Sequence, residues 1–149
     1  MPVNRYLEDV CVGERHDAGS VEVSEAEIVE FARKYDPQPM HLDAEFAAHT
    51  RFRGLIASGW HTAALVMRQI ARARPFGDTE VLGIGLENLR WHQPVRPGDT
   101  LHVVIEVTGV APSESNPRYG TVRFQITTRN QRGETVMTHS PVCWLPRRP

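Results

Sequence analysis

The residues of this sequence whose types and spacing could do chemistry are a carboxylate and an imidazole five positions apart, Asp36 and His41. Pro37 and Pro39 lie between them and predict a stiff, extended loop that can point both side chains into one pocket. Such a pair can hold a water molecule and move protons in both directions, as the addition of water to an activated double bond requires. On these residues alone, the competing interpretation is structural: Asp36 would cap a loop, and His41 would be a half-buried histidine.

A second candidate group follows at Ser58 and Gly59, where an apolar helix is predicted to begin. Backbone N–H groups in the first turn of a helix could stabilise a negative charge that develops on an enolate oxygen. Glycine at this point would allow a carbonyl group to approach the backbone closely.

Several common chemistries lack their motifs here. The sequence contains no GxSxG elbow, no GxGxxG after a strand, no Walker loop, no HExxH and no CxxC. Its seven histidines are scattered, and none is paired with another at i, i+4. Cys11 and Cys143 are far apart, with neither metal-ligand spacing nor the pattern of a secreted disulfide scaffold. We therefore expect no metal, no cofactor and no nucleotide-phosphate site of the usual kinds.

Composition sets broad limits. A chain of 149 residues is expected to form one domain over 1–149, large enough to bury a sizeable core. Apolar residues make up 40% and charged residues 23%, and the net charge is −1, which gives no global attraction to nucleic acid or anionic lipid. With neither a signal-peptide pattern nor a membrane-spanning apolar run in this sequence, the expected location is the cytoplasm.

The N-terminal half predicts an extended lead-in over 1–13 and a strand over 15–23. Ser24 and Glu27 form a capping-box pattern, and the helix that they open ends at Pro37. A short helix over 44–48 and a long helix from about Ser58 follow. The long helix carries a wide apolar stripe and is expected to be buried on most sides. The stripe comprises Ile56, Trp60, Ala63, Ala64, Leu65, Val66, Met67, Ile70 and Ala71.

The C-terminal half changes to a period of two. Strands are predicted over 81–91, 101–108, 119–129 and 134–145, with a hairpin turn before the last and Pro141 indicating a bulge or an edge. One long helix with strands before and after it indicates an α+β protein in which an antiparallel sheet curls around the helix. Dimerisation is a common way to cover the edge that such a sheet leaves open.

Four segments resemble the MaoC-like acyl dehydratases, a family that includes the (R)-specific enoyl-CoA hydratases with the hotdog fold. They are YLED at 6–9, FARKYDPQPMH at 31–41, GLIASGWHT at 54–62 and RPGD at 96–99. These segments follow the family's order over nearly the whole chain. The Asp-x₄-His element with its downstream glycine is the most specific of them, whereas the Pro-Gly-Asp turn alone would be weak.

The resemblance implies a hotdog fold, a homodimer or dimer of dimers, and a hydro-lyase acting on the 2,3 double bond of an enoyl-CoA-type thioester. It implies that Asp36 and His41 bind and activate the water, and that the Gly59 N–H polarises the thioester carbonyl. The only CoA would be the one carried by the substrate. The other candidate substrate-binding residues are Ser58, Trp60 and His61, although Trp60 could belong to the core and His61 could be structural.

The chain departs from the hydratase pattern at two places beside the proposed pocket. Asp-x-Asn-Pro is here Asp36-Pro37-Gln38-Pro39, and the usual His-Gly is here Ser58-Gly59. These departures concern the substrate more than the fold. Arginines could also meet the phosphates of CoA or lie on the surface; the candidates are Arg90, Arg96 and Arg118.

Two alternative functions remain. Many hotdog thioesterases use a carboxylate of the central helix, but no Asp or Glu occurs between Gly54 and Arg74. A catalytically silent hotdog dimer that binds acyl-CoA would also fit the sequence, because the presence of Asp36 and His41 does not prove that they are aligned.

Overall fold

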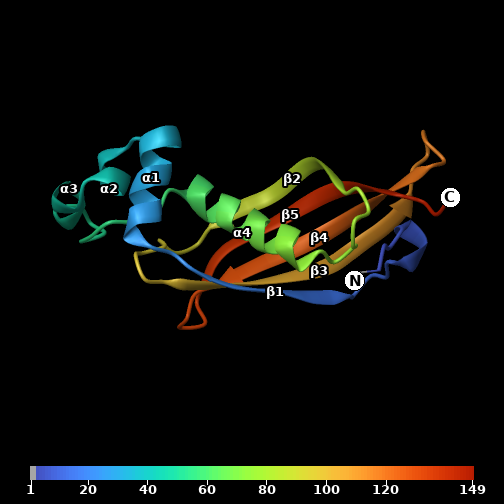
Figure 1. Ribbon diagram of the computed structural model, residues 1–149, viewed down its shortest axis with the longest axis horizontal. Coiled ribbons are helices and arrows are strands. Elements are labelled where there is room, and N and C mark those ends of the chain that lie inside the picture. Colours follow the sequence, from blue (N-terminus) through green and yellow to red (C-terminus); the bar gives the residue numbers. More distant parts are fainter. Residues whose placement is uncertain (1–2) are drawn as a thin grey trace.

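Alternating apolar side chains build the sheet in the computed structural model, which describes residues 3–149. Five antiparallel strands lie in the order β1-β3-β4-β5-β2, with α4 across one face and α1 to α3 gathered at one end (Figure 1). The strands are β1 (Arg15–Glu22), β2 (Leu82–Trp91), β3 (Thr100–Pro112), β4 (Tyr119–Arg129) and β5 (Thr135–Pro146). The helices are α1 (Glu25–Tyr35), α2 (Pro39–Leu42), α3 (Ala44–Ala48) and α4 (Gly59–Ala73), with a 3₁₀ turn, η1, at Leu7–Asp9. The prediction of an α+β protein with an antiparallel sheet is confirmed.

The core lies between the sheet and α4. Strand β3 buries alternate residues, from Leu101 to Val107, and β4 does the same from Val122 to Ile126. This period of two places one apolar face of the sheet against the helix and the other, more polar face toward solvent. On α4 the buried residues are His61, Thr62, Leu65, Val66 and Gln69.

The expectation that α4 is buried on most sides is wrong for the single chain. Trp60 is 60% exposed and Met67 is 56% exposed, because the sheet covers only one side of the helix. The edge strand β2 also exposes apolar side chains, namely Leu82, Ile84 and Leu86. Together α4 and β2 leave an apolar surface that the chain does not cover by itself.

Gln69 ties α4 to the edge strand β1. The register between β1 and β3 shifts between Asp17 and Ser20, where Gly19 adopts a positive φ of 78°. The Gln69 side-chain amide donates to the carbonyl oxygens of Ala18 and Ser20 at 3.2 and 3.1 Å. A buried polar side chain thereby satisfies the backbone at the bulge and fixes the helix relative to the sheet.

Two local expectations change. The lead-in over 1–13 contains η1 rather than only extended chain; Met1 and Pro2 lie outside the described residues. Pro141 does not mark an edge, because β5 lies between β4 and β2. The pairing of β2 with β5 is irregular on both sides of Pro141, with register shifts opposite Val142 and Cys143 and opposite Thr138 and Ser140. Across residues 3–149, no helix has the length and apolar character needed to cross a membrane.

Candidate active site

Asp36 and His41 lie at the end of the sheet where α1, α2 and α3 gather (Figure 1). Asp36 caps the C-terminus of α1, which Ser24 opens by accepting a hydrogen bond from the Glu27 N–H. The extended loop predicted between them is wrong in part, because Pro39 occupies the first turn of α2 and places His41 within that short helix. Proline suits this position since its ring presets a helical φ and its missing N–H has no helical partner there.

The two side chains face each other. His41 Nε2 lies 3.4 Å from Asp36 Oδ2, and the imidazole is buried while the carboxylate is partly open. His41 Nδ1 donates to the backbone carbonyl oxygen of Ile56 at 2.7 Å. This bond fixes the tautomer and ring orientation, so Nε2 is the nitrogen free to exchange a proton in front of Asp36.

The Asp36 carboxylate is held through both oxygens. Ser58 Oγ donates to Oδ2 at 2.6 Å, and the Gln38 side-chain amide donates to Oδ1 at 2.7 Å. The Ser58 hydrogen bond lowers the pKa of Asp36, and the Gln38 hydrogen bond and the electrostatic effect of the nearby His41 add to this, while partial burial opposes the shift. Donors aimed at a carboxylate favour its ionised form.

Gly59 begins α4 directly behind this pair. Ser58 caps the helix, accepting a hydrogen bond from the Trp60 N–H at 3.3 Å. The Gly59 N–H meets no acceptor among residues 3–149, as expected for the first residue of a helix. On its other side the indole of Trp91 lies so close that a Cβ on residue 59 would be 2.5 Å from ring atom Cε2.

A pocket of about 530 Å³ joins these groups. Trp60 and Trp91 form one wall as an edge-to-face pair, with centroids 5.3 Å apart and planes at 83°. The lining residues are Asp36, Gln38, Met40, His41, Arg51, Phe52, Ile56, Ala57, Gly59, Trp60, Thr62, Trp91, His92, Gln93, Pro94 and Val95. The structure thus brings Asp36, His41, Gly59 and Trp60 to one cavity. Ser58 lies behind Asp36 and is fully buried.

His61 is not among the residues of 3–149 that line this pocket. Its ring stacks on Phe31 of α1, with centroids 4.8 Å apart and planes at 10°. Burial lowers the pKa of His61, which favours a neutral ring. Of the two roles left open for His61, substrate binding and a structural one, these contacts fit the structural role, because one residue of helical rotation past Trp60 turns the ring toward α1.

Comparison with known proteins shows which family this geometry belongs to. The family model for the MaoC like domain matches residues 10–130. A crystal structure of the MaoC-like dehydratase from Rhodospirillum rubrum superposes with a TM-score of 0.89 at 43% identity, covering 98% of this chain and 99% of that one. The chain belongs to the MaoC-like dehydratase family.

Two curated relatives with named activities are similar over most of the chain. The (R)-specific enoyl-CoA hydratase of Rhodospirillum rubrum is 27% identical over 96% of this chain and 93% of its own length. The 3-hydroxybutyryl-CoA dehydratase of Methylorubrum extorquens is 32% identical over 76% of this chain and 70% of its own. The fold of this MaoC-like protein is the hotdog fold, with α4 as its central helix.

Sequence reasoning missed several residues of the MaoC-like site. Gln38 could have been found from the sequence, because it lies inside the Asp36–His41 segment. Its side-chain amide donates to the Asp36 carboxylate. No sequence pattern pointed to Trp91 or to the Ile56 carbonyl. Only the folded chain brings Trp91 against Gly59 and the Ile56 carbonyl to His41. Among the arginines, Arg96 lies beside Gly54 near the pocket, whereas Arg118 belongs to the β3–β4 loop at the opposite end of the sheet (Figure 1).

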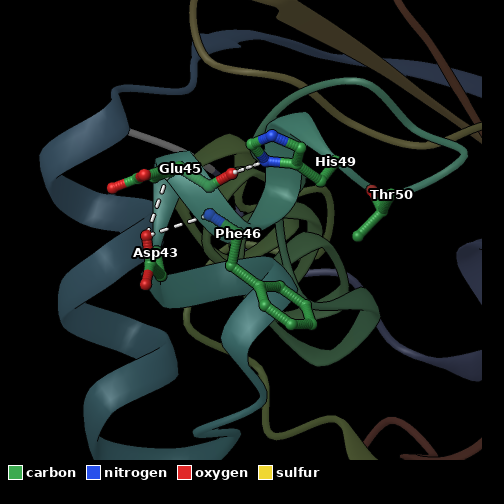
Figure 2. Close-up of a pocket in the computed structure, with 5 residues that line it drawn as sticks. All are labelled: Asp43, Glu45, Phe46, His49 and Thr50. Carbon is green, nitrogen blue, oxygen red and sulfur yellow. Dashed lines mark hydrogen bonds between the residues drawn. The ribbon is translucent and has the colours of Figure 1, made fainter.

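A second pocket, of about 370 Å³, lies against α3 and is lined by Asp43, Glu45, Phe46, His49 and Thr50 (Figure 2). Asp43, His49 and Thr50 bind backbone groups of the helix itself. Asp43 Oδ1 accepts from the N–H groups of Glu45 and Phe46, and His49 Nδ1 donates to the Glu45 carbonyl at 2.8 Å (Figure 2). This pocket has the contacts of a helix cap rather than a reactive pair. Residues 3–149 contain no group of three potential metal ligands.

Proposed function

We propose that this MaoC-like protein is a hydro-lyase that adds water to, or removes it from, the 2,3 double bond of an enoyl-CoA-type thioester. The observation that carries the proposal is the 3.4 Å approach of His41 Nε2 to Asp36 Oδ2 in a pocket that Gly59 also lines. The names of the two curated relatives, a hydratase and a dehydratase of CoA thioesters, support the same reaction class.

The chemistry follows from these positions. A water held by Asp36 and His41 gives up a proton to one of them while its oxygen bonds to C3 of the enoyl group. The electron pair of the double bond moves toward the thioester oxygen, where the Gly59 N–H stabilises the enolate. A proton then reaches C2, and dehydration runs through the same steps in reverse. The two groups lie close enough to share protons, so the acid and base roles belong to the pair.

The pocket suits an acyl thioester. Its walls are mainly apolar, including the indoles of Trp60 and Trp91, while the reactive groups gather at one place. Arg51 lines the pocket with an exposed guanidinium, and Arg96 lies near it. We assign these two arginines, ahead of Arg118, to the phosphates of the CoA carrier, because a guanidinium is a strong phosphate ligand.

We further propose that the chain is one MaoC-like domain and works as a homodimer or dimer of dimers. Exposed apolar side chains on α4 and β2, such as Met67, Leu82 and Ile84, support this assembly. Contiguous apolar surfaces on monomers are usually interaction sites, and β2 is an edge strand with unpaired backbone groups.

The deciding experiment follows absorbance at the enoyl-thioester band with crotonyl-CoA and with longer or branched enoyl-CoAs, together with release of free CoA thiol. Loss of the band without thiol release is the expected result. Thiol release would instead identify a thioesterase, although α4 has no carboxylate to serve one. Binding of acyl-CoA with no change in absorbance and no thiol would identify a silent binding protein.

A further inference from the structure

Ser58 makes two side-chain hydrogen bonds, and one of them uses the only proton of its hydroxyl group. It donates its only proton to Asp36 Oδ2 at 2.6 Å and accepts from the Trp60 N–H at 3.3 Å. The residue is 0% exposed and does not line the pocket among the described residues. A hydroxyl whose proton is bound to a carboxylate cannot also donate to a substrate carbonyl. The expectation that Ser58 binds substrate therefore does not fit its contacts.

The oxygen that Ser58 binds is the one that faces His41. Asp36 Oδ2 receives the Ser58 hydrogen bond and lies 3.4 Å from His41 Nε2. The other carboxylate oxygen accepts a hydrogen bond from the Gln38 side-chain amide. Gln38 is exposed, so water competes for this hydrogen bond. Ser58 is thus the buried contact that determines where Oδ2 points, and its 2.6 Å bond has the length of a charge-assisted O–H···O⁻ interaction.

We propose that Ser58 is a positioning residue that holds Asp36 Oδ2 in front of His41 and links this carboxylate to the N-terminus of α4. The inference rests on the proposed function and deepens it. Residue 58 precedes Gly59, so one short segment sets both the orientation of the proton-transfer pair and the place of the N–H that meets the thioester oxygen. Catalysis depends steeply on such distances, because reacting groups must be held close to their productive geometry.

The simpler role for Ser58 is that of a helix cap. A cap contributes to stability through the Trp60 N–H alone and has no effect on the ionisation of Asp36. Ser24 provides a matched control, since it caps α1 through the Glu27 N–H at 3.2 Å and has an exposed side chain away from the pocket. Ser24→Ala and Ser58→Ala both remove a serine cap, but only Ser58→Ala removes a donor from Asp36.

The test compares wild type, Ser58→Ala, Ser58→Thr and Ser24→Ala by thermal melts, by kinetics over pH and by NMR titration of the Asp36 carboxyl carbon. We expect Ser58→Ala to lower kcat by about 10- to 100-fold, the loss typical of a hydrogen bond to a charged group, with a smaller change in KM. The Asp36 titration and the acidic limb of the rate profile should both move to higher pH, because the ionised carboxylate loses a donor. Ser58→Thr, which keeps the hydroxyl, should remain near wild type, and Ser24→Ala should change only the melting temperature.

An unchanged Asp36 titration in a folded Ser58→Ala protein would overturn the inference, as would equal kinetic effects of Ser58→Ala and Ser24→Ala. If Ser58→Ala does not fold, the Asp36 titration in Ser58→Thr decides: a titration like that of wild type supports the hydroxyl's role, and one moved to higher pH refutes it. The NMR measurement does not depend on turnover. If Asp36 shifts as expected while wild type shows no hydration, the proposed function fails and the contact between Ser58 and Asp36 stands.

Discussion

The indole of Trp91 lies against the α-carbon of Gly59, leaving no room for a side chain at the first residue of α4. A Cβ built there would lie 2.5 to 2.9 Å from three atoms of the ring system. Gly59 does not have a positive φ, so glycine is required by this contact rather than by backbone conformation. Gly59 lines the same pocket as His41, so the packing of Trp91 helps set where the backbone of residue 59 lies in it.

Gly59→Ala is therefore expected to push Trp91 or the start of α4 out of place. Overpacking of this kind costs about 1 to 3 kcal/mol, and a displaced donor should lower kcat by about 10-fold or more. Chemical denaturation and the enoyl-CoA hydration assay measure the two effects. Trp91→Leu combined with Gly59→Ala should recover part of the stability; a Gly59→Ala protein with wild-type stability and kcat would show that the contact does not constrain the site.

Substituting Asp36 or His41, which face each other in the pocket, should lower activity strongly while leaving the fold largely intact. Asp36→Asn and His41→Ala should each lower hydration by about 10²- to 10⁴-fold, the range for loss of a general acid or base. Since the two groups act as a unit, the double variant should be little worse than either single variant. His49→Ala is the control, because this exposed histidine follows α3 and lies outside the pocket, and the variant should keep full activity. Intact activity in both single variants would remove the site assignment.

Local sequence rules predicted most of the fold. The serine cap before Glu25, the proline after Asp36 and the period of two in β3 and β4 act through neighbours in the chain, so their structures follow from short stretches. The α2 turn was missed because proline has two effects, and both apply at Pro39. Gln38 before it is extended, as the residue before a proline prefers, while Pro39 itself occupies the first turn of a helix.

The features of the site that could not be predicted from the sequence depend on contacts between residues far apart in the chain. The pairing of Asp36 with His41 was expected from five-residue spacing, but the roles of Ser58 and His61 depended on which way each side chain turns. Ser58 differs from the usual family residue, a change expected to concern substrate, and the structure places it against Asp36 instead. His61 stacks on Phe31, thirty positions away in the sequence, and no local pattern encodes that contact.

The uncovered apolar surface of α4 and β2 predicts an assembly that a single charge should weaken. Met67 is 56% exposed on the outer side of α4, so Met67→Glu would bury a carboxylate if a second copy covers this surface. We expect the variant to shift toward monomer in light scattering at low micromolar concentration. Val12→Glu, at an exposed apolar residue before β1, is the control. Identical masses for wild type and both variants would mean that this surface is not the dimer interface.

His139 gives the protein a pH-dependent stability that is separate from catalysis. It lies on β5, is 8% exposed, and its Nδ1 has no hydrogen-bond partner among residues 3–149. Burial lowers its pKa from 6.5 to about 4. The unfolded chain therefore binds a proton between these values while the folded chain does not, so stability is lost as pH falls through this window.

The expected loss from this one group between pH 7 and pH 4.5 is about 2 to 3 kcal/mol, taken from the shift in pKa. His139→Gln should remove that part of the pH dependence even if it lowers stability at pH 7. Urea unfolding at pH 7 and pH 4.5, at one protein concentration, measures the change in the free energy of unfolding between the two pH values. His49→Gln, at an exposed histidine, should keep the wild-type slope. A His139→Gln protein that loses as much stability as wild type on acidification would show that the imidazole is not held neutral in the fold.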